Sequence, residues 1–261
     1  MFQPLMLLVA CAARPSQPPP AVAQAAQPEA DPGPLLSHET PLGELVVTLV
    51  YHGTVKLEFG DQVWFVDPWS KAQLTGTADV ILLTDVHFDH LDNDALKQVE
   101  DADTIYVAPQ AVVDHEGFAA RTAHHVLANG EAVEVGGVHI EAVPMYNLIR
   151  GPKEGGVFHD KGRGNGYILT VGDTRLYIAG DTECTPEMKA LTGITHALLP
   201  MNLPYTMTPA EAAECVRAFG PKMITPIHYA GTSQQDISAA LSGIKGSLLI
   251  EKDAYPGGAP W

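Results

Sequence analysis

Four titratable side chains follow a short apolar run in the first half of the chain. Val80 to Leu83 are all apolar, which favours a strand that is buried on both faces. The titratable residues that follow it are Asp85, His87, Asp89 and His90. Imidazole and carboxylate groups are ligands that Zn, Mn and Fe accept, and a catalytic site also leaves one coordination position to water. The run therefore predicts a metal site at a strand end; the alternative is a solvated loop.

Two later strand ends carry the same kinds of side chain. Asp181 follows the β-rich segment Arg175 to Ala179, and His228 directly follows Met223 to Ile227. Three strand ends with the same ligand chemistry are far less expected by chance than one. This agreement favours the metal site over the solvated loop.

The surrounding segments predict an α/β domain that positions these side chains. Three β-rich runs separated by short turns indicate an antiparallel meander: Leu45 to Val50, Thr54 to Phe59 and Val63 to Val66. A strand at Val80 to Leu83, a helix capped by Asp92 and a strand at Thr104 to Ala108 come next. That order implies parallel pairing through a right-handed crossover.

Three motifs together resemble the metallo-β-lactamase fold. The run from Asp85 to His90 is similar to the signature His-x-His-x-Asp-His, with Asp85 in place of the first His. Gly-Asp-Thr at Asp181 resembles the segment whose Asp bridges two metals in that family, and Pro-Ile-His-Tyr at His228 resembles the segment that completes the second metal site. The resemblance spans roughly Leu42 to Glu251 and implies a four-layer αββα sandwich.

The resemblance also implies two divalent metal ions. One ion would be held by His87 and Asp181 with one of three further residues: His159, Asn147 or Asp85. The other would be held by Asp89, His90, Asp181 and His228, and Asp89 would also orient the catalytic water. Zn is the ion most expected in the family. Because Asp85 offers an anionic oxygen in place of a neutral nitrogen, Mn or Fe, or the loss of one ion, is the expected consequence.

Four further residues depart from the family pattern or support its site. Asn147 stands where a third His is common, and His159 in the next loop is either its replacement or an ordinary loop histidine. His52 and Asp67 match positions that support the metal site without binding metal, and a hydrogen-bonded turn is the alternative role for His52.

Basic residues gather in one loop of an otherwise acidic chain. Arg150, Lys153, Lys161 and Arg163 are four of the fifteen basic residues. Glycines between them would let backbone N–H groups approach the same anion. We therefore expect substrate binding by Asn147, Lys161, Arg163 and Tyr229, although a flexible solvated loop is the alternative.

Net charge and family resemblance together bound the function. The formal net charge of −16 argues against nucleic-acid binding, which requires a basic face. The resemblance implies a metal-dependent hydrolase that directs a metal-activated water at a small anionic phosphoester, lactone or amide. The alternatives are a catalytically degenerate protein that binds metal or ligand, and a true β-lactamase. The sequence does not indicate an oligomeric state.

The N-terminus predicts a membrane anchor. Residues 1–11 are mainly apolar, and Leu8-Val9-Ala10-Cys11 resembles a bacterial lipobox whose Cys is lipidated. Residues 12–41 are rich in Pro, Ala and Gln, which predicts a tether before a hydrolase domain at 42–261. The chain is therefore expected to be a periplasmic lipoprotein; without lipidation it would be cytoplasmic.

Two cysteines remain, Cys184 and Cys215, and their separation in sequence does not establish a disulfide. Cys215 falls in a helical pattern and is expected to be a packing residue. Cys184 is expected to be an ordinary loop thiol near Asp181.

Overall fold

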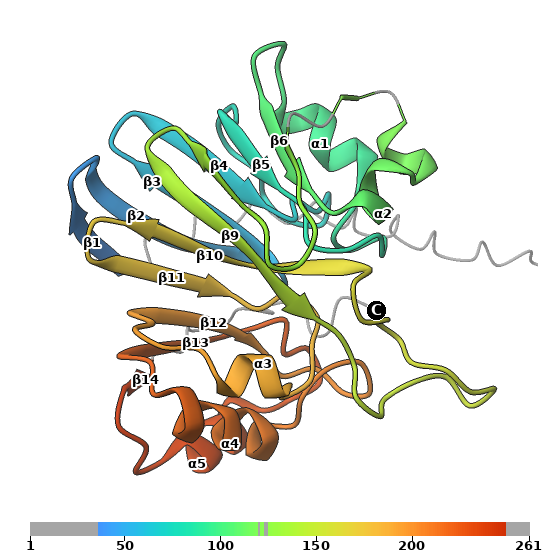
Figure 1. Cartoon of the computed structure of the whole chain (residues 1–261), viewed down its shortest axis with the longest axis vertical. Helices are drawn as coiled ribbons and strands as arrows, with labels where there is room; N and C mark the ends of the chain where they lie inside the picture. Colours follow the sequence, from blue (N-terminus) through green and yellow to red (C-terminus); the bar gives the residue numbers. More distant parts are fainter. Residues whose placement is uncertain (1–35, 120, 123–124, 249–261) are drawn as a thin grey trace, which may run out of the picture.

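The computed structural model describes residues 36–119, 121–122 and 125–248. Two mixed β-sheets of seven strands each lie face to face within this part of the chain, and helices cover their outer sides (Figure 1). The predicted α/β fold, a four-layer αββα sandwich, is therefore confirmed. The predicted signal segment with Cys11 and most of the tether lie outside the described residues. Among the described helices, none has the length and apolar character needed to cross a membrane.

The first sheet has its strands in sequence order. Its antiparallel half contains β1 (Leu36–Thr40), β2 (Gly43–Tyr51), β3 (Thr54–Phe59) and β4 (Gln62–Val66). Its parallel half adds β5 (Val80–Leu82), β6 (Ile105–Ala108) and β7 (His125–Val126). The predicted meander and crossover are both present. The boundary predicted between tether and domain is placed too late, because β1 already pairs with β2 from Leu36 onward.

The second sheet repeats this arrangement. Its antiparallel half contains β8 (Ala132–Val135), β9 (Val138–Met145), β10 (Gly164–Val171) and β11 (Thr174–Ile178). Its parallel half adds β12 (His196–Pro200), β13 (Met223–Ile227) and β14 (Ser247–Leu248). Loops after parallel strands emerge at one edge of a sheet, where α/β proteins place their sites.

Short helices form the outer layers. The first sheet carries α1 (Asn93–Val99), α2 (Gln110–Val113) and the 3-10 helix η1 (Glu116–Phe118), and the second carries α3 (Pro186–Lys189), α4 (Pro209–Phe219) and α5 (Gln234–Leu241). Asp92 caps α1 as predicted, accepting from two backbone N–H groups. Thr208 and Glu211 form a capping box at the start of α4.

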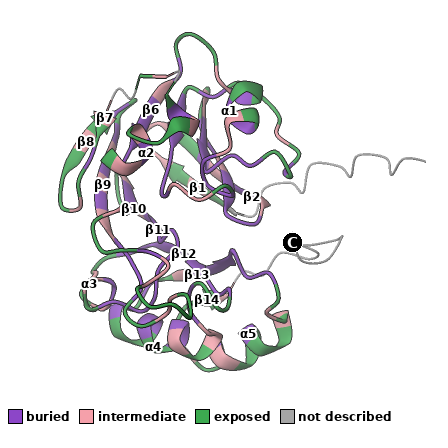
Figure 2. Cartoon of the chain, turned by 90° about the vertical axis from the view of Figure 1, so that its right-hand side faces the viewer, coloured by how far each residue is buried: buried purple, intermediate pink, exposed green. Residues whose placement is uncertain are grey.

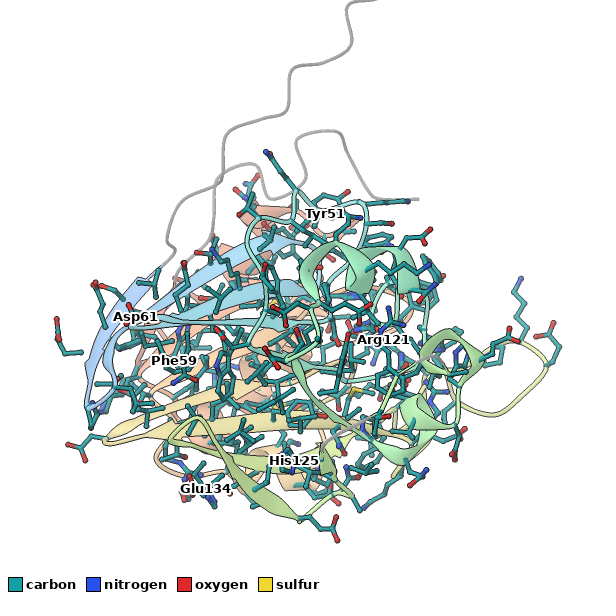
Figure 3. The ribbon with its side chains drawn as sticks, turned by 90° about the horizontal axis from the view of Figure 1, so that it is seen from above. Tyr51, Phe59, Asp61, Arg121, His125 and Glu134 are labelled. Carbon is teal, nitrogen blue, oxygen red and sulfur yellow. A yellow bond between two sulfur atoms is a disulfide. The ribbon has the colours of Figure 1, made fainter. Side chains whose placement is uncertain are left out.

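The main core lies between the two sheets. Trp64 and Leu57 of the first sheet and Tyr167 and Leu169 of the second belong to one buried cluster. Figure 2 shows the central strands mostly in purple, as buried, whereas β8 at a sheet edge and much of the outer sides of the helices are green, as exposed. In Figure 3 Phe59 lies among the interior side chains, whereas Asp61 lies at a turn on the rim. Apolar burial of this extent gives the two site-bearing sheet edges a rigid base.

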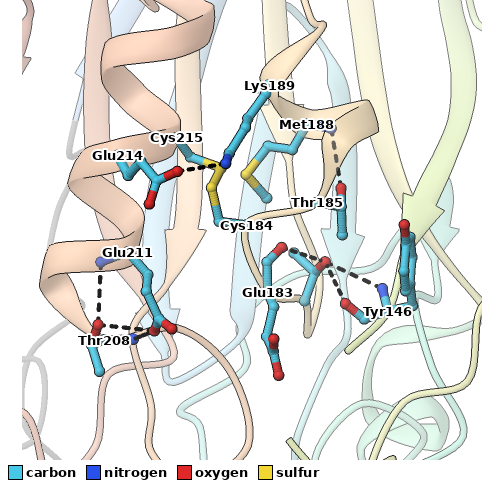
Figure 4. The surroundings of a disulfide bond; sticks show 11 residues. Tyr146, Glu183, Cys184, Thr185, Met188, Lys189, Thr208, Glu211, Glu214 and Cys215 are labelled. Atoms are coloured by element: carbon cyan, nitrogen blue, oxygen red, sulfur yellow. Dashed lines mark hydrogen bonds and ion pairs between the residues drawn. A yellow bond between two sulfur atoms is a disulfide. The ribbon is translucent and has the colours of Figure 1, made fainter. Parts of the chain in front are cut away.

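A disulfide joins Cys184 to Cys215, so the prediction of two separate thiols is wrong (Figure 4). Their Cα atoms lie 5.7 Å apart although 31 positions separate them in sequence. Sequence separation carries no information about this distance, because α4 packs beside α3, next to the loop that holds Cys184. The bond ties the loop that follows Asp181 to the second half of α4.

Three residues at strand ends have left-handed backbone conformations. His52, Asp67 and His228 have φ values of 57°, 45° and 44°, and they are the only described residues other than glycine with positive φ. Such a conformation costs about 1–3 kcal/mol for a residue with a side chain and gathers at functional sites. All three follow directly on a strand, after β2, β4 and β13. Their side chains meet in the site described next.

Candidate metal centre

Four side chains converge where the two parallel sheet edges meet, and we call this set the inner position: Asp89, His90, Asp181 and His228. Nε2 of His228 lies 3.2 Å from Oδ2 of Asp89 and 3.4 Å from Oδ1 of Asp181. Nε2 of His90 lies 3.4 Å from Oδ2 of Asp181 and 3.9 Å from Oδ1 of Asp89. All four residues are buried. The loop after β5 carries two of these residues, and the segments after β11 and β13 carry one each. The structure therefore brings together the strand ends that the sequence pointed to.

Asp67 orients His90 from behind. Oδ2 of Asp67 lies 2.8 Å from Nδ1 of His90, and the same carboxylate accepts from the backbone N–H and the hydroxyl of Thr84. A carboxylate acceptor at Nδ1 keeps a proton there, so Nε2 is the nitrogen that faces the inner position and could bind a metal ion. The left-handed turn at Asp67 is what directs this carboxylate back toward the site.

His52 supports the opposite side of the inner position. Its ring lies against the ring of His228, with centroids 3.6 Å apart, and its Nε2 lies 3.3 Å from Oδ2 of Asp89. Burial, together with the neighbouring His228, lowers the pKa of His52 to about 4. His52 is therefore uncharged near neutral pH. Although it lies in the turn after β2, its side chain contacts the residues of the inner position.

The carboxylates of the inner position stay charged despite their burial. Burial opposes ionisation of Asp181 and Asp89, but the imidazoles around them hold the pKa of both carboxyls well below the ordinary range. Burial also lowers the pKa of His90, and the carboxylates of Asp181, Asp89 and Asp67 outweigh it and raise that pKa well above its ordinary value. His90 therefore carries a positive charge beside these carboxylates in the metal-free protein, and a divalent ion bound at Nε2 would replace that proton.

A second group of side chains, which we call the outer position, lies beside the inner one: Asp85, His87 and His159. Nε2 of His159 lies 3.4 Å from Oδ2 of Asp181 and 3.8 Å from Oδ2 of Asp85. His159 is 1% exposed, so it is not an ordinary loop histidine. Asp181 faces both positions through its two oxygens, which is the arrangement expected of a bridging carboxylate.

Asn147 positions His159 and does not itself face the site. Its Oδ1 lies 2.6 Å from Nδ1 of His159, while its Nδ2 donates to Glu183 and to the backbone carbonyl of Tyr205. These two donor bonds fix the amide, and an amide oxygen can only accept, so Nδ1 of His159 carries the proton. The predicted roles of Asn147 as ligand or substrate contact are replaced by this supporting one.

Arg163 pairs with Asp85 instead of lying open to a substrate. Its Nε lies 3.0 Å from Oδ1 of Asp85 and its Nη2 lies 2.9 Å from Oδ2. Nδ1 of His87 lies 2.7 Å from the same Oδ2. Both oxygens of this fully buried carboxylate are thus occupied, and together these partners hold the pKa of Asp85 far below its ordinary value although burial opposes this.

The remaining predicted substrate contacts also lie elsewhere. Lys161 pairs with Glu187 at 2.5 Å and lies over the ring of Tyr146, on the exposed side of the loop. Tyr229 is buried in the core between the second sheet and its helices. Neither residue is among those that line the pocket described next, and their predicted contacts with a substrate stay predictions.

A pocket of about 360 Å³ opens onto both positions. Besides site residues it is lined by Phe88, Phe158, Asn202 and Tyr205, none of which we predicted. Phe88 is 66% exposed, and the ring of Phe158 meets that of Tyr205 edge-on with centroids 5.0 Å apart. A weak signal was present, because Phe88 and Phe158 each adjoin a predicted ligand and Asn202 follows the end of β12.

The ligand atoms that face one another between the inner and outer positions fit a divalent metal ion. Nε2 of His90, Nε2 of His159 and Oδ1 of Asp181 are buried and have no hydrogen-bond partner. Unpaired buried polar atoms are costly, so three that face one another indicate a missing common partner. Neutral imidazole and carboxylate are the ligand types that Zn, Mn and Fe accept.

Comparisons with known proteins agree with this geometry. Residues 46–228 match the family model described as the β-lactamase superfamily domain. A UPF0173 metal-dependent hydrolase of Geobacillus is 29% identical over 205 residues, covering 70% of this chain and 84% of the relative. One of Thermococcus kodakarensis is 32% identical over 156 residues, covering 58% and 67%.

Solved structures show the same fold. A crystal structure from Parabacteroides distasonis, described as that of a metal-dependent hydrolase, has a TM-score of 0.74 and 38% identity, covering 83% of this chain and 97% of the other. Igni18 of Ignicoccus hospitalis, at 19% identity and a TM-score of 0.62, shares the fold over 79% and 94% of the two chains. The chain therefore belongs to the β-lactamase superfamily, with the metallo-β-lactamase fold, and its homologues are metal-dependent hydrolases of that superfamily.

Proposed function

We propose that this chain is a hydrolase that directs a metal-activated water at a phosphoester, lactone or amide bond of a small anionic substrate. The observation that carries the proposal is the convergence of buried ligand atoms without hydrogen-bond partners, from His90, His159 and Asp181, beside a pocket that His159 and Asp181 line. Divalent ions bound there would supply Lewis acidity and would lower the pKa of a bound water. The family resemblance predicts two ions, with Zn first among them, and Mn or Fe also suits this ligand set.

Asp89 is the group that we assign to proton transfer. It lines the pocket, and His228 and His52 each place an Nε2 within 3.3 Å of its Oδ2. Those contacts hold the carboxylate in one orientation while Oδ1 remains directed toward His90. A carboxylate fixed in this way can orient a water in the pocket and accept its proton.

The residues that line the pocket suggest which chemical groups the substrate has in addition to the bond that is cleaved. Phe88, Phe158 and Tyr205 present aromatic surface, and no Lys or Arg is among the pocket-lining residues. An anionic group would therefore find its opposite charge at the metal centre, while an apolar part of the substrate would pack on the rings. We thus favour an anionic ester or lactone that also bears an apolar group.

The cellular location is a separate proposal. We infer a periplasmic lipoprotein that is anchored to the membrane through Cys11, and the Cys184–Cys215 disulfide supports an oxidising compartment. Mass spectrometry of the N-terminal peptide from the membrane fraction tests this. Release of a Cys11→Ser variant into the soluble periplasm is the expected result, and retention of full-length chain in the cytoplasm would contradict it.

The function itself is tested by metal content and turnover together. Metal-free protein is reloaded with Zn, Mn or Fe and assayed on bis-p-nitrophenyl phosphate, a panel of lactones and a β-lactam. We expect turnover of an ester or lactone that requires metal and disappears in Asp181→Ala. Bound metal without turnover on any substrate would support the non-catalytic binding protein, and β-lactam turnover alone would support the β-lactamase.

A further inference from the structure

The inner and outer positions differ in how their carboxylates are already satisfied. At the inner position Oδ1 of Asp181 and Nε2 of His90 have no hydrogen-bond partner. At the outer position Asp85 makes a two-pronged ion pair with Arg163, and Oδ2 also faces Nδ1 of His87. Nε2 of His159 at the outer position is also without a hydrogen-bond partner, so the two positions differ at Asp85. An ion entering the outer position through Asp85 has to compete with these bonds, whereas Nε2 of His90 and Oδ1 of Asp181 have no hydrogen bond to give up.

The backbone holds Arg163 in this place. The next residue, Gly164, starts β10 so close to the first sheet that a Cβ on it would lie 2.7 Å from the carbonyl oxygen of Thr84. The N–H of Asn165 donates to that same carbonyl at 2.9 Å. Arg163 is thereby fixed beside Asp85, the residue that follows Thr84. The ion pair follows from sheet-to-sheet contact and not from a chance loop conformation.

The guanidinium also lies against another outer ligand. Nη2 of Arg163 is 3.5 Å from Nε2 of His87, the ring nitrogen of His87 that Asp85 leaves open. A guanidinium keeps its charge at any pH at which the protein is folded. A divalent ion bound at that nitrogen would therefore lie close to a permanent positive charge, which opposes its binding.

We propose that Arg163 takes the place of a second metal ion, so that the chain holds one divalent ion tightly, at the inner position. Asp85 then serves as the counter-charge of Arg163, not as a metal ligand. This inference rests on the proposed function only in requiring that the inner position binds metal. On this proposal, the replacement of the first signature His by Asp85 goes together with a change in the number of bound ions from two to one.

Metal stoichiometry tests the proposal without reference to activity. Metal-free full-length protein is titrated with Zn and with Mn by calorimetry, and the complexes are weighed by native mass spectrometry. We expect one tightly bound ion per chain in the wild type and two in Arg163→Met, which keeps the side-chain stem but removes the charge. Lys161→Met is the matched control, because it removes a charge from the same loop away from the outer ligands, and it should remain at one ion.

A second variant tests the proposal even if Arg163→Met does not fold, which is a risk because Arg163→Met leaves the buried Asp85 without its guanidinium partner. Asp85→His/Arg163→Met removes both charges and restores the His-x-His-x-Asp-His signature, and it should bind two ions. Two ions of similar affinity in the wild type, or one ion in the double variant, would overturn the proposal while leaving the metal-dependent hydrolase intact. No bound ion in the wild type would overturn both.

Discussion

Burial of His196 makes the stability of this protein fall in mild acid. The side chain is fully buried at the start of β12, where Nε2 shares a hydrogen bond of 2.8 Å with the hydroxyl of Thr225. Its Nδ1 has no hydrogen-bond partner, and the ring of His38 lies 6.0 Å away between centroids. Burial, with a smaller contribution from His38, lowers the pKa of His196 to about 3.

The size and sign of the effect follow from linkage. The unfolded chain binds a proton at His196 near pH 6.5, whereas the folded chain does so only near pH 3. The free energy of unfolding therefore decreases as the pH falls below about 6.5, by up to about 1.4 kcal/mol per pH unit. Between pH 8 and pH 5 His196 alone should cost about 2 kcal/mol.

Urea unfolding of metal-free protein at both pH values measures this loss. Metal-centre residues also titrate, so the informative quantity is the wild-type loss minus the loss in His196→Gln, which has no titratable group there. Burial also lowers the pKa of His38, so His38 also reduces the free energy of unfolding in acid. His38 is present in both proteins, and its contribution cancels in the difference. A difference of about 2 kcal/mol is expected from the linkage above. Equal losses in the two proteins would refute the assignment to His196.

Three other outcomes are expected. Cys215→Ser, or a reducing buffer, should lower the free energy of unfolding by about 4 kcal/mol, since the disulfide closes a loop of 31 positions; unchanged urea midpoints would contradict this. Asp67→Asn should weaken zinc affinity about 10- to 100-fold in a chelator competition, because His90 loses the carboxylate that fixes its proton. Phe88→Ser should raise the KM for aryl esters with little change in kcat, while Ile149→Ser, exposed but outside the pocket, should leave KM unchanged.

The metal ligands that follow strands could be predicted because strand ends are local features. An apolar run followed by His and Asp shows where a strand ends, and the family signature shows which ends meet. This reasoning found Asp89, His90, Asp181 and His228, which the structure brings within a few ångströms of one another. The four-layer fold followed from the same resemblance and from the order of strands and helices.

Side-chain pairs formed by loops could not be predicted in this way. Arg163 and Lys161 lie in a loop whose composition suggested anion binding, yet each is paired with a carboxylate that is distant in sequence. Asn147 occupied the position of a ligand, but only the structure shows that its amide faces Nδ1 of His159. Composition records which charges a loop carries and not where they point.

The sequence by itself determined the fold family, the strand ends and the ligand types, because these depend on local hydrophobic pattern and on motifs of fixed spacing. Tertiary structure alone decided that Arg163 meets Asp85, that Cys184 bonds to Cys215 and that Phe158 lies against Tyr205. Each of these pairs joins segments that the two packed sheets bring together. Their contacts depend on distances through space, which sequence separation does not contain.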